Sequence, residues 1–328
     1  MNFQLSDDSK AILMLCSHLG LLPKPDPSPL TLREWNPIAR RLAASEMRPG
    51  DLLGKSAPEL AIILNETNEK TGRIACLLDR GGSVAIELER LASLGIWIWT
   101  RVDDGYPIKY RDRLKDSAPP VLFGAGDQNL PGDPGIAIVG SRNVNNAGQK
   151  MAEFVGNACS HSGMVVYSGG ARGVDRYSMK AAIEGRGFSV GVLAHSLVKV
   201  IREADFRQAI TSGNLTLITP YSPYAGFNVG AAMGRNKLIY TLADYGLVIA
   251  SDADKGGTWT GANEVLKHHW LPLFVVQGSS VPDGNKELLN RGGIPFPDPF
   301  SGDINEFHHW FKEHSEDFDT PPKQLPLI

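Results

Sequence analysis

The stretch from residue 136 to residue 175, IAIVGSRNVNNAGQKMAEFVGNACSHSGMVVYSGGARGVD, decides the fold of this chain. It contains two apolar runs, IAIVG (136–140) and MVVYS (164–168), separated by a spacer that is long enough for one helix. The apolar residues are continuous rather than alternating, which is typical of strands buried on both faces of a sheet. The stretch therefore predicts two parallel strands joined by a helix.

Four more runs of this kind follow, separated by further helix-length spacers: FSVGVLA (188–194), LTLIT (215–219), GLVIAS (246–251) and LPLFVV (271–276). Six strands alternating with helices indicate an α/β fold with a doubly wound, mostly parallel sheet over residues 135–300. In such sheets, ligands bind beyond the carboxyl ends of the strands. The residues after each run are therefore the candidate site.

Residues 1–100 predict a small all-α domain that precedes the sheet. Apolar residues recur at helical spacing in segments 8–22, 32–45, 58–66, 70–78 and 84–94, and Pro- and Gly-bearing stretches separate these segments. Residues 101–134 are interpreted as a non-periodic connector with a short extended piece at 121–123. Residues 301–328 predict a short helix followed by a flexible tail.

Charge is distributed unevenly along the 328 residues. The chain is 42% hydrophobic and 21% charged with a net charge of −3, which excludes a disordered chain and a polycation that coats nucleic acid. Residues 141–240, however, hold eleven Lys or Arg against five Asp or Glu, a net charge of +6 that leaves −9 for the rest. We expect an anionic ligand to bind in this stretch.

The three cysteines are widely spaced and include no CxxC pair, which predicts reduced thiols rather than disulfides or a zinc site. The first residues lack the basic start of a signal peptide, and the AILMLC run is too short to span a bilayer. We expect a cytoplasmic protein without a membrane segment, a bound metal or a cofactor.

Small, hydroxyl-bearing and basic residues follow three of the predicted strands. The candidates are Gly140, Ser141 and Arg142; Ser168, Gly169, Gly170, Arg172, Gly173 and Asp175; Gly256, Gly257, Thr258 and Thr260; and, before the fifth run, Arg235, Asn236 and Lys237. Glycines let backbone N–H groups approach an anion, helix starts favour phosphate, and Arg offers a forked donor. One such turn alone could simply be tight, but three at one edge predict an anion-binding groove with no catalytic residue.

Several motifs that mark common nucleotide-binding and catalytic sites are absent from the sequence. The sequence has no GxxxxGK[ST] motif, which excludes a P-loop, and no GxGxxG after the first strand, which excludes the usual dinucleotide site. The stretch VYSGG lacks the first glycine of a nucleophile elbow.

The motifs IVGSR (138–142), SGGARGVD (168–175), GRNKLI (234–239) and GGTWTGA (256–262) resemble the DNA-processing protein A (DprA/Smf) family, in the family's order. The resemblance implies a Rossmann-like domain that binds single-stranded DNA, commonly as a homodimer. It also implies protection of incoming strands and help in loading the RecA recombinase during natural transformation. By motif position, Arg142, Arg235 and Lys237 would hold phosphates, while the glycine-rich turns would form the groove.

Aromatic side chains commonly stack on the bases of single strands. Tyr221, Tyr224 and Phe227, upstream of the Arg235 motif, are candidates for this role, although each could instead pack beneath a loop.

Two alternative functions remain open. The segment GGTWTGANE (256–264) also resembles the LOG phosphoribohydrolases, which cleave nucleoside monophosphates, and in that case Glu264 would be the catalytic carboxylate. A nucleotide-signal sensor of the same fold, acting in defence, would have a closed pocket instead of a groove.

The terminal peptide QLPLI (324–328), from Gln324 to Ile328, resembles the short peptides with which bacterial proteins dock on the replication sliding clamp. An inert tail is the alternative.

Overall fold

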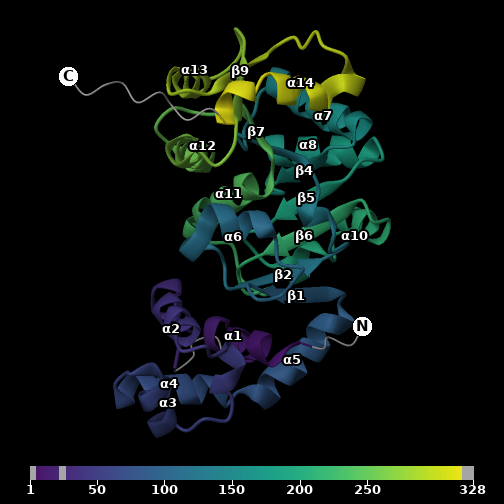
Figure 1. Ribbon diagram of the computed structural model, residues 1–328. Coiled ribbons are helices and arrows are strands. Elements are labelled where there is room, and N and C mark those ends of the chain that lie inside the picture. Colours follow the sequence, from purple (N-terminus) through teal and green to yellow (C-terminus); the bar gives the residue numbers. More distant parts are fainter. Residues whose placement is uncertain (1–4, 22–26, 320–328) are drawn as a thin grey trace, which may run out of the picture. The chain divides into compact units, whose positions relative to one another are not determined.

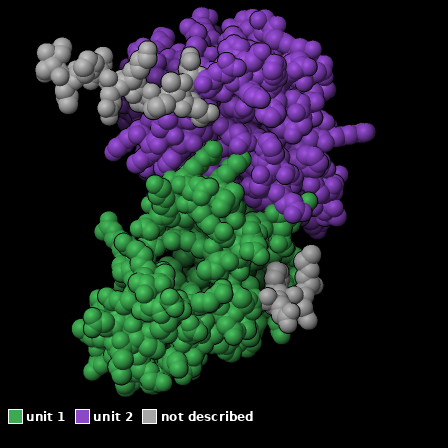
Figure 2. Space-filling model, in the orientation of Figure 1, with its two compact units in different colours: residues 1–128, 195–202, 218–226 green, residues 129–194, 203–217, 227–328 purple. Residues whose placement is uncertain are grey.

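The chain forms two compact units (Figure 2). The structure is a computed structural model and describes residues 5–21 and 27–319. Unit 1 comprises residues 1–128, 195–202 and 218–226, and unit 2 comprises residues 129–194, 203–217 and 227–328. The first residues of the predicted flexible tail, 315–319, are instead ordered and include the 3-10 helix η5 (Glu316–Asp319). The rest of the tail, with the QLPLI peptide, lies outside the described residues from residue 320 onward.

Unit 1 begins with helices at the five segments where the sequence predicts them. They are α1 (Asp7–Cys16), α2 (Leu32–Ala44), α3 (Ala57–Leu64), α4 (Asn68–Leu78) and α5 (Gly81–Ser93), with the 3-10 helix η1 (Pro49–Leu52) between α2 and α3. Their apolar faces pack together, with Leu13, Leu60, Leu64 and Leu77 fully buried. The unit also holds the antiparallel strands β1 (Ile96–Thr100) and β2 (Val121–Ala125), together with α6 (Ile108–Leu114), η2 (Lys115–Ser117) and α9 (Leu197–Val200).

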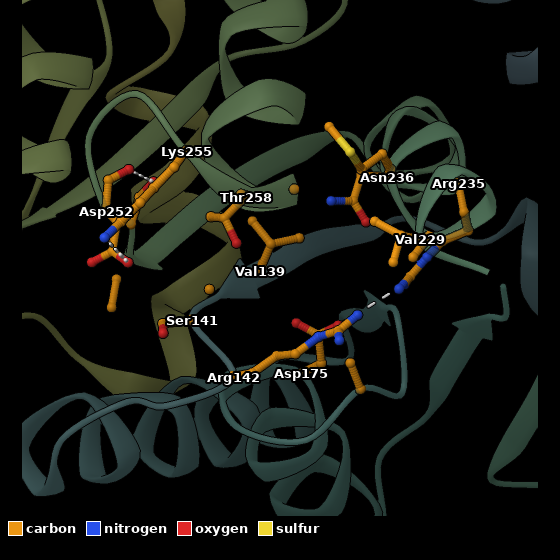
Figure 3. A pocket seen from close by; sticks show the side chains of 18 of the residues that line it. Val139, Ser141, Arg142, Asp175, Val229, Arg235, Asn236, Asp252, Lys255 and Thr258 are labelled. Carbon is orange, nitrogen blue, oxygen red and sulfur yellow. Dashed lines mark hydrogen bonds and ion pairs between the residues drawn. The ribbon is translucent and has the colours of Figure 1, made fainter. Parts of the chain in front are cut away.

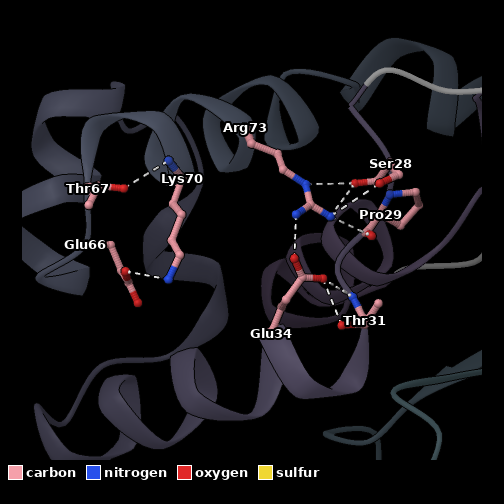
Figure 4. Close-up of polar contacts among 8 residues, drawn as sticks. All are labelled: Ser28, Pro29, Thr31, Glu34, Glu66, Thr67, Lys70 and Arg73. Carbon is pink, nitrogen blue, oxygen red and sulfur yellow. Dashed lines mark hydrogen bonds and ion pairs between the residues drawn. The ribbon is translucent and has the colours of Figure 1, made fainter.

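A polar cluster ties the start of α2 to α4 (Figure 4). The Glu34 carboxylate accepts hydrogen bonds from the backbone N–H and the hydroxyl of Thr31, both at 2.8 Å, which closes a capping box on α2. Arg73 of α4 donates to the other Glu34 oxygen and to the carbonyl oxygens of Ser28 and Pro29. One guanidinium thus anchors the chain segment that leads into α2.

Unit 2 is built on a parallel sheet. Its strands are β3 (Gly135–Gly140), β4 (Val165–Ser168), β5 (Ser189–Val192), β6 (Leu215–Thr219), β7 (Tyr245–Ala250), β8 (Leu273–Gln277) and β9 (Ile294–Pro297), in the order β6-β5-β4-β3-β7-β8-β9. The last two residues of β6, Ile218 and Thr219, are assigned to unit 1. The pairs β3–β4, β3–β7, β4–β5, β7–β8 and β8–β9 are parallel. This order confirms the predicted doubly wound, Rossmann-like α/β fold and places the switch point between β3 and β7.

Helices cover both faces of this sheet (Figure 1). One layer contains α7 (Asn146–Ser162), α8 (Val174–Glu184), α10 (Ala204–Thr211) and α14 (Phe307–Glu313), and the other contains α11 (Val229–Leu242), α12 (Gly256–His268) and α13 (Asp283–Asn290). Right-handed crossovers produce this arrangement because the chain leaves β3 in one direction and later returns to β7 on the other side. The strands between the two layers are almost entirely buried.

Three elements differ from the sequence-based expectation. The connector contains the short helix α6, whose Tyr110 and Leu114 are buried, and seven residues are too few to show a clear helical period. Strand β1, IWIWT, is buried along its whole length and begins directly after Gly95, whose φ of +73° is typical of a glycine that ends a helix. Strand β9, IPFP, carries two prolines, which are tolerated because it is the edge strand beside β8.

The segment after β9 is held by aromatic packing. Phe307 and Phe311 of α14 are fully buried, and Phe311 lies edge-on to Phe274 of β8 with ring centroids 4.6 Å apart. The predicted short helix is therefore part of the core of unit 2. Over residues 5–21 and 27–319, no helix has the length and apolar character needed to cross a bilayer.

The Glu34 cluster predicts a pH-dependent contribution to stability. The hydrogen bond from Arg73 lowers the pKa of Glu34 to about 2. Because the pKa is depressed in the folded state, this stabilisation is present above the ordinary pKa near 4.5 and is lost as the pH falls towards 2. We expect Glu34→Gln to reduce the free energy of unfolding at pH 6 by on the order of 1 kcal/mol or less, since the pair is partly exposed.

Urea denaturation of both proteins at pH 6 and at pH 2.5 measures this difference. The gap between Glu34→Gln and the wild type should narrow at the lower pH, whereas Glu89→Gln, at an exposed position of α5, should follow the wild type throughout. A gap that is equal at both pH values would contradict the assignment.

Candidate functional site

A cavity of about 360 Å³ lies at the carboxyl ends of β3, β4 and β7, next to the switch point. We call it the switch-point cavity. It is lined by Val139, Gly140, Ser141, Arg142, Ala171, Asp175, Phe227, Val229, Ala232, Met233, Arg235, Asn236, Ala250, Ser251, Asp252, Lys255, Gly256, Gly257 and Thr258, all from unit 2. Its volume falls within the range of ~300–1,000 Å³ that is usual for ligand sites.

Two turns that leave the sheet pack tightly against each other at the base of this cavity. A Cβ at Gly173 would lie 2.3 Å from the carbonyl oxygen of Ser141, and φ of Gly173 is +91°. A Cβ at Gly140 would lie 2.5 Å from Cγ2 of Val174. Glycine is therefore required for the turn after β4 to reach the turn after β3.

A buried ion pair joins the turn after β4 to α11. Arg235 is 4% exposed and its Nη1 lies 3.9 Å from Oδ2 of Asp175, which is 7% exposed (Figure 3). A Cβ at Gly169 would lie only 1.5 Å from Nη1 of Arg235, so this guanidinium rests directly on the backbone of the turn. The backbone N–H groups of Gly169 and Ala171 donate to the Asp175 carboxylate.

Burial and charge act in opposite directions on Asp175. Removal from water raises the pKa of its carboxyl group above the ordinary value. The guanidinium of Arg235, the two backbone N–H groups and Arg142 lower this pKa and so partly offset the effect of burial. The carboxylate therefore acts as a fixed acceptor that orients the turn and Arg235.

Arg142 reaches the cavity from the turn after β3. It is exposed, and its guanidinium carbon lies 5.4 Å from the centroid of the Phe227 ring, a cation–π contact. Phe227 is 58% exposed, and the neighbouring Val229 and Met233 are also exposed large apolar side chains. A basic group and an apolar surface thus meet on one rim of the cavity.

The start of α12 forms another wall. Gly256 has φ of +85° and begins the helix, so backbone N–H groups of the first turn are not used within it. The amide of Asn236 packs against Gly257, where a Cβ would lie 2.5 Å from Nδ2. Lys255 and Asp252 form an exposed pair at 3.7 Å across the cavity from Arg235 (Figure 3). A helix start of this kind favours an anion.

The cavity brings together nine of the candidates from the sequence, namely Gly140, Ser141, Arg142, Asp175, Arg235, Asn236, Gly256, Gly257 and Thr258. The other seven, Ser168, Gly169, Gly170, Arg172, Gly173, Lys237 and Thr260, do not line it. Two of these residues make hydrogen bonds that hold the strand ends and turns next to the cavity. Ser168 donates its hydroxyl to the Ile138 carbonyl oxygen at 2.6 Å, and Arg172 donates to the side-chain oxygen of Asn143 in the turn after β3.

Nine lining residues were among neither the phosphate candidates nor the aromatic candidates: Val139, Ala171, Val229, Ala232, Met233, Ala250, Ser251, Asp252 and Lys255. Asp252 and Lys255 lie between the end of β7 and the GGTWTG motif, so the same rule about strand ends could have found them. Val229 and Met233 carry no such signal, because their exposure on α11 becomes visible only in the folded chain.

The three aromatic candidates fall in different units. Phe227 belongs to unit 2 and lines the cavity, whereas Tyr221 and Tyr224 belong to unit 1. Within unit 1, the Tyr224 hydroxyl donates to Glu87 at 3.0 Å and the Arg90 guanidinium lies 5.1 Å from the Tyr224 ring centroid.

The donors in the switch-point cavity suit an anion. Two guanidinium groups and the first turn of α12 face a space with one buried, internally satisfied carboxylate. Among the described residues, no group of three or more His, Cys, Asp or Glu side chains could hold a metal ion. The arrangement can therefore bind a phosphate through hydrogen bonds and charge.

Comparisons with known proteins find similarity to proteins of DNA recombination and DNA processing. Residues 97–294 match the family described as DNA recombination-mediator protein A. DNA processing protein DprA of Bacillus subtilis (strain 168) is 27% identical over 179 residues, which cover 53% of this chain and 60% of that protein. The match thus spans less than two thirds of the length of that relative.

Two solved structures share the fold. The X-ray structure of DprA from Streptococcus pneumoniae covers 90% of this chain and 95% of its own, with a TM-score of 0.64 and 18% identity. DNA processing protein A from Helicobacter pylori, whose single-stranded DNA binding mode is described, covers 66% of this chain and 96% of its own, with a TM-score of 0.54 and 24% identity.

The close contact between Gly169 and Arg235 can be tested by substituting the glycine. Gly169→Ala would place a methyl group where the guanidinium lies, so we expect a loss of about 1–3 kcal/mol in the free energy of unfolding. Gly132→Ala is the matched control, because nothing lies within 4 Å of its Cβ position. Urea denaturation of the two variants measures the effect. Equal stabilities would show that Arg235 does not rest on this turn.

Proposed function

Because the chain belongs to the DNA recombination-mediator protein A family, we propose that it binds single-stranded DNA by holding backbone phosphates in the switch-point cavity. The observation that carries this proposal is the convergence of Arg142, Arg235 and the first turn of α12 on one cavity. Phosphates are shared by every DNA sequence, so binding would depend little on sequence as far as these contacts are concerned. The H. pylori relative, which binds single-stranded DNA, supports the ligand class.

The cations of the cavity have different roles in this proposal. Arg235 is paired with Asp175 and is buried, so it shapes the floor and adds a directed donor. Among the described residues that line the cavity, Arg142 is the basic side chain without a carboxylate within 4.0 Å. Arg142 is thus the principal phosphate contact. Lys237, which does not line the cavity, would contact the strand only beyond it.

The apolar rim gives the bases of the strand a contact surface. The exposed ring of Phe227 provides a face on which a base can stack, and Arg142 already lies over the same ring system. Stacking of this kind contributes ~1–3 kcal/mol per base and tolerates every base. A strand with its phosphate at Arg142 and a base near Phe227 would use both features.

The two alternatives have weaker support. Glu264, the carboxylate that a phosphoribohydrolase would need, is not among the residues that line the cavity. A nucleotide-signal sensor would bind a mononucleotide in the same place, so this alternative must be separated from strand binding by experiment. The proposal therefore assigns the protein a binding function rather than a catalytic one.

Membership of this family suggests a biological role for the proposed DNA binding. We propose that the protein acts in the cytoplasm, protects single strands and assists the loading of a RecA-type recombinase, and that it works as a homodimer. This role would place it in DNA processing, either in natural transformation or in recombination, with defence as a further setting.

The proposal is tested by replacing Arg142. Because one phosphate contact is lost, Arg142→Ala should weaken binding about tenfold for all sequences alike. It should also reduce the slope of log K against log salt concentration by ~0.7. Fluorescence anisotropy with a labelled oligonucleotide over a salt series measures both values. Lys267→Ala is the control, since it removes the same charge from the far end of α12, ~15 Å away along the helix.

Two results would contradict the proposal. The first is unchanged affinity in Arg142→Ala together with an unchanged salt slope. The second is a large thermal stabilisation by a mononucleotide with none by an oligonucleotide, which would favour the sensor.

A further inference from the structure

A second cavity adjoins the switch-point cavity along the same edge of the sheet. It has a volume of about 130 Å³ and shares Ser141, Ala250 and Asp252 with the first. Its other walls come from the start of α7, the end of β8 and the loops that follow β8 and β9. We call it the side cavity. The shared residues place the two cavities next to each other at the same edge of the sheet.

We propose that the side cavity takes one base of the bound strand and favours cytosine over thymine. This inference rests on the proposed function, because a phosphate in the switch-point cavity is what would bring a base to the side cavity. The volume of about 130 Å³ is well below the ~300 Å³ at which ligand sites usually begin. It therefore suits a single ring rather than a whole nucleotide.

The walls of the side cavity are largely apolar, as the faces of a base require. The apolar lining residues are Val144, Ala147, Met151, Ile249, Ala250, Val276, Val281 and Pro282. Every base has an apolar face that packs on such a surface, and its edge carries the polar atoms. Selection among bases therefore depends on the polar groups at the rim.

The rim offers a charged acceptor. Asp298, which lines the side cavity and is exposed, has no ion pair or side-chain hydrogen bond with any residue in the described ranges. Asn145, another lining residue, is already engaged, since it accepts from the Gly148 N–H at 2.8 Å and donates to the Ser280 carbonyl oxygen at 3.3 Å. A carboxylate only accepts hydrogen bonds, so a ligand group that pairs with Asp298 must be a hydrogen-bond donor.

Cytosine and thymine differ in the group that they carry on ring atom C4. Cytosine carries an amino group on C4, which donates to a carboxylate, whereas thymine carries a carbonyl oxygen there, which a carboxylate repels. Asp252, the other acid of the side cavity, is paired with Lys255 at 3.7 Å, so Asp298 is the group that would discriminate. One such contact corresponds to a preference on the order of tenfold.

The test compares three homo-oligonucleotides of equal length, made of dC, dT or dU, by fluorescence anisotropy with the full chain. We expect dC to bind about tenfold more tightly than both others. Including dU separates the amino group from the methyl group, because dU lacks both and dT lacks only the amino group.

Asp298→Asn supplies the matching protein variant. Its amide can both donate and accept, so the preference for dC should disappear while binding to dT is unchanged or stronger. Glu153→Gln is the control: Glu153 is exposed on α7 and accepts from the Gln149 side chain at 2.9 Å outside the side cavity. The Glu153→Gln variant loses the same charge as Asp298→Asn and should still bind dC more tightly than dT.

Equal affinities for the three oligonucleotides, or a preference that survives in Asp298→Asn, would overturn this inference while leaving the proposed function intact. Failure of all three to bind would overturn the proposed function, and this inference with it.

Discussion

The site depends on the close approach of the turn after β4 to its neighbours, the turn after β3 and the helix α11. Gly173 allows the backbone contact with Ser141, and Gly169 leaves room for the guanidinium of Arg235. Arg235 and Asp175 are both buried and 3.9 Å apart, and either one alone would be a costly buried charge. The glycines and the pair therefore stabilise one arrangement in which three chain segments meet at the switch point of the sheet.

This arrangement also explains how a chain with a net charge of −3 presents an anion site. The charge of Asp175 is compensated inside the protein, and Asp252 is paired with Lys255, so neither carboxylate opposes a phosphate at Arg142 without compensation. The backbone N–H groups at the start of α12 add donors that carry no counter-charge of their own. Local geometry, not total charge, determines the character of the cavity.

Much of the fold and part of the candidate site could be predicted from the sequence. Continuous Val- and Ile-rich runs predicted six strands of the parallel sheet, because burial on both faces leaves a strong local signal. The short elements α6 and β9 could not be predicted, since their burial is set by tertiary packing. Strand β1 was missed although IWIWT is rich in β-branched and aromatic residues and follows a glycine that ends the helix before it. Strand-end reasoning found Arg142 and Asp175, and the basic motif before the fifth run supplied Arg235. Neither showed that Arg235 is buried in an ion pair or that Lys237 lies outside the cavity, because both depend on helix orientation.

The central claim is that the switch-point cavity holds a phosphate of single-stranded DNA, and a crystal structure of the full chain with a bound oligonucleotide tests it most directly. The account predicts a backbone phosphate within hydrogen-bond distance of the Arg142 guanidinium and of the first N–H groups of α12. A strand bound on another face, with no phosphate in the cavity, would contradict it.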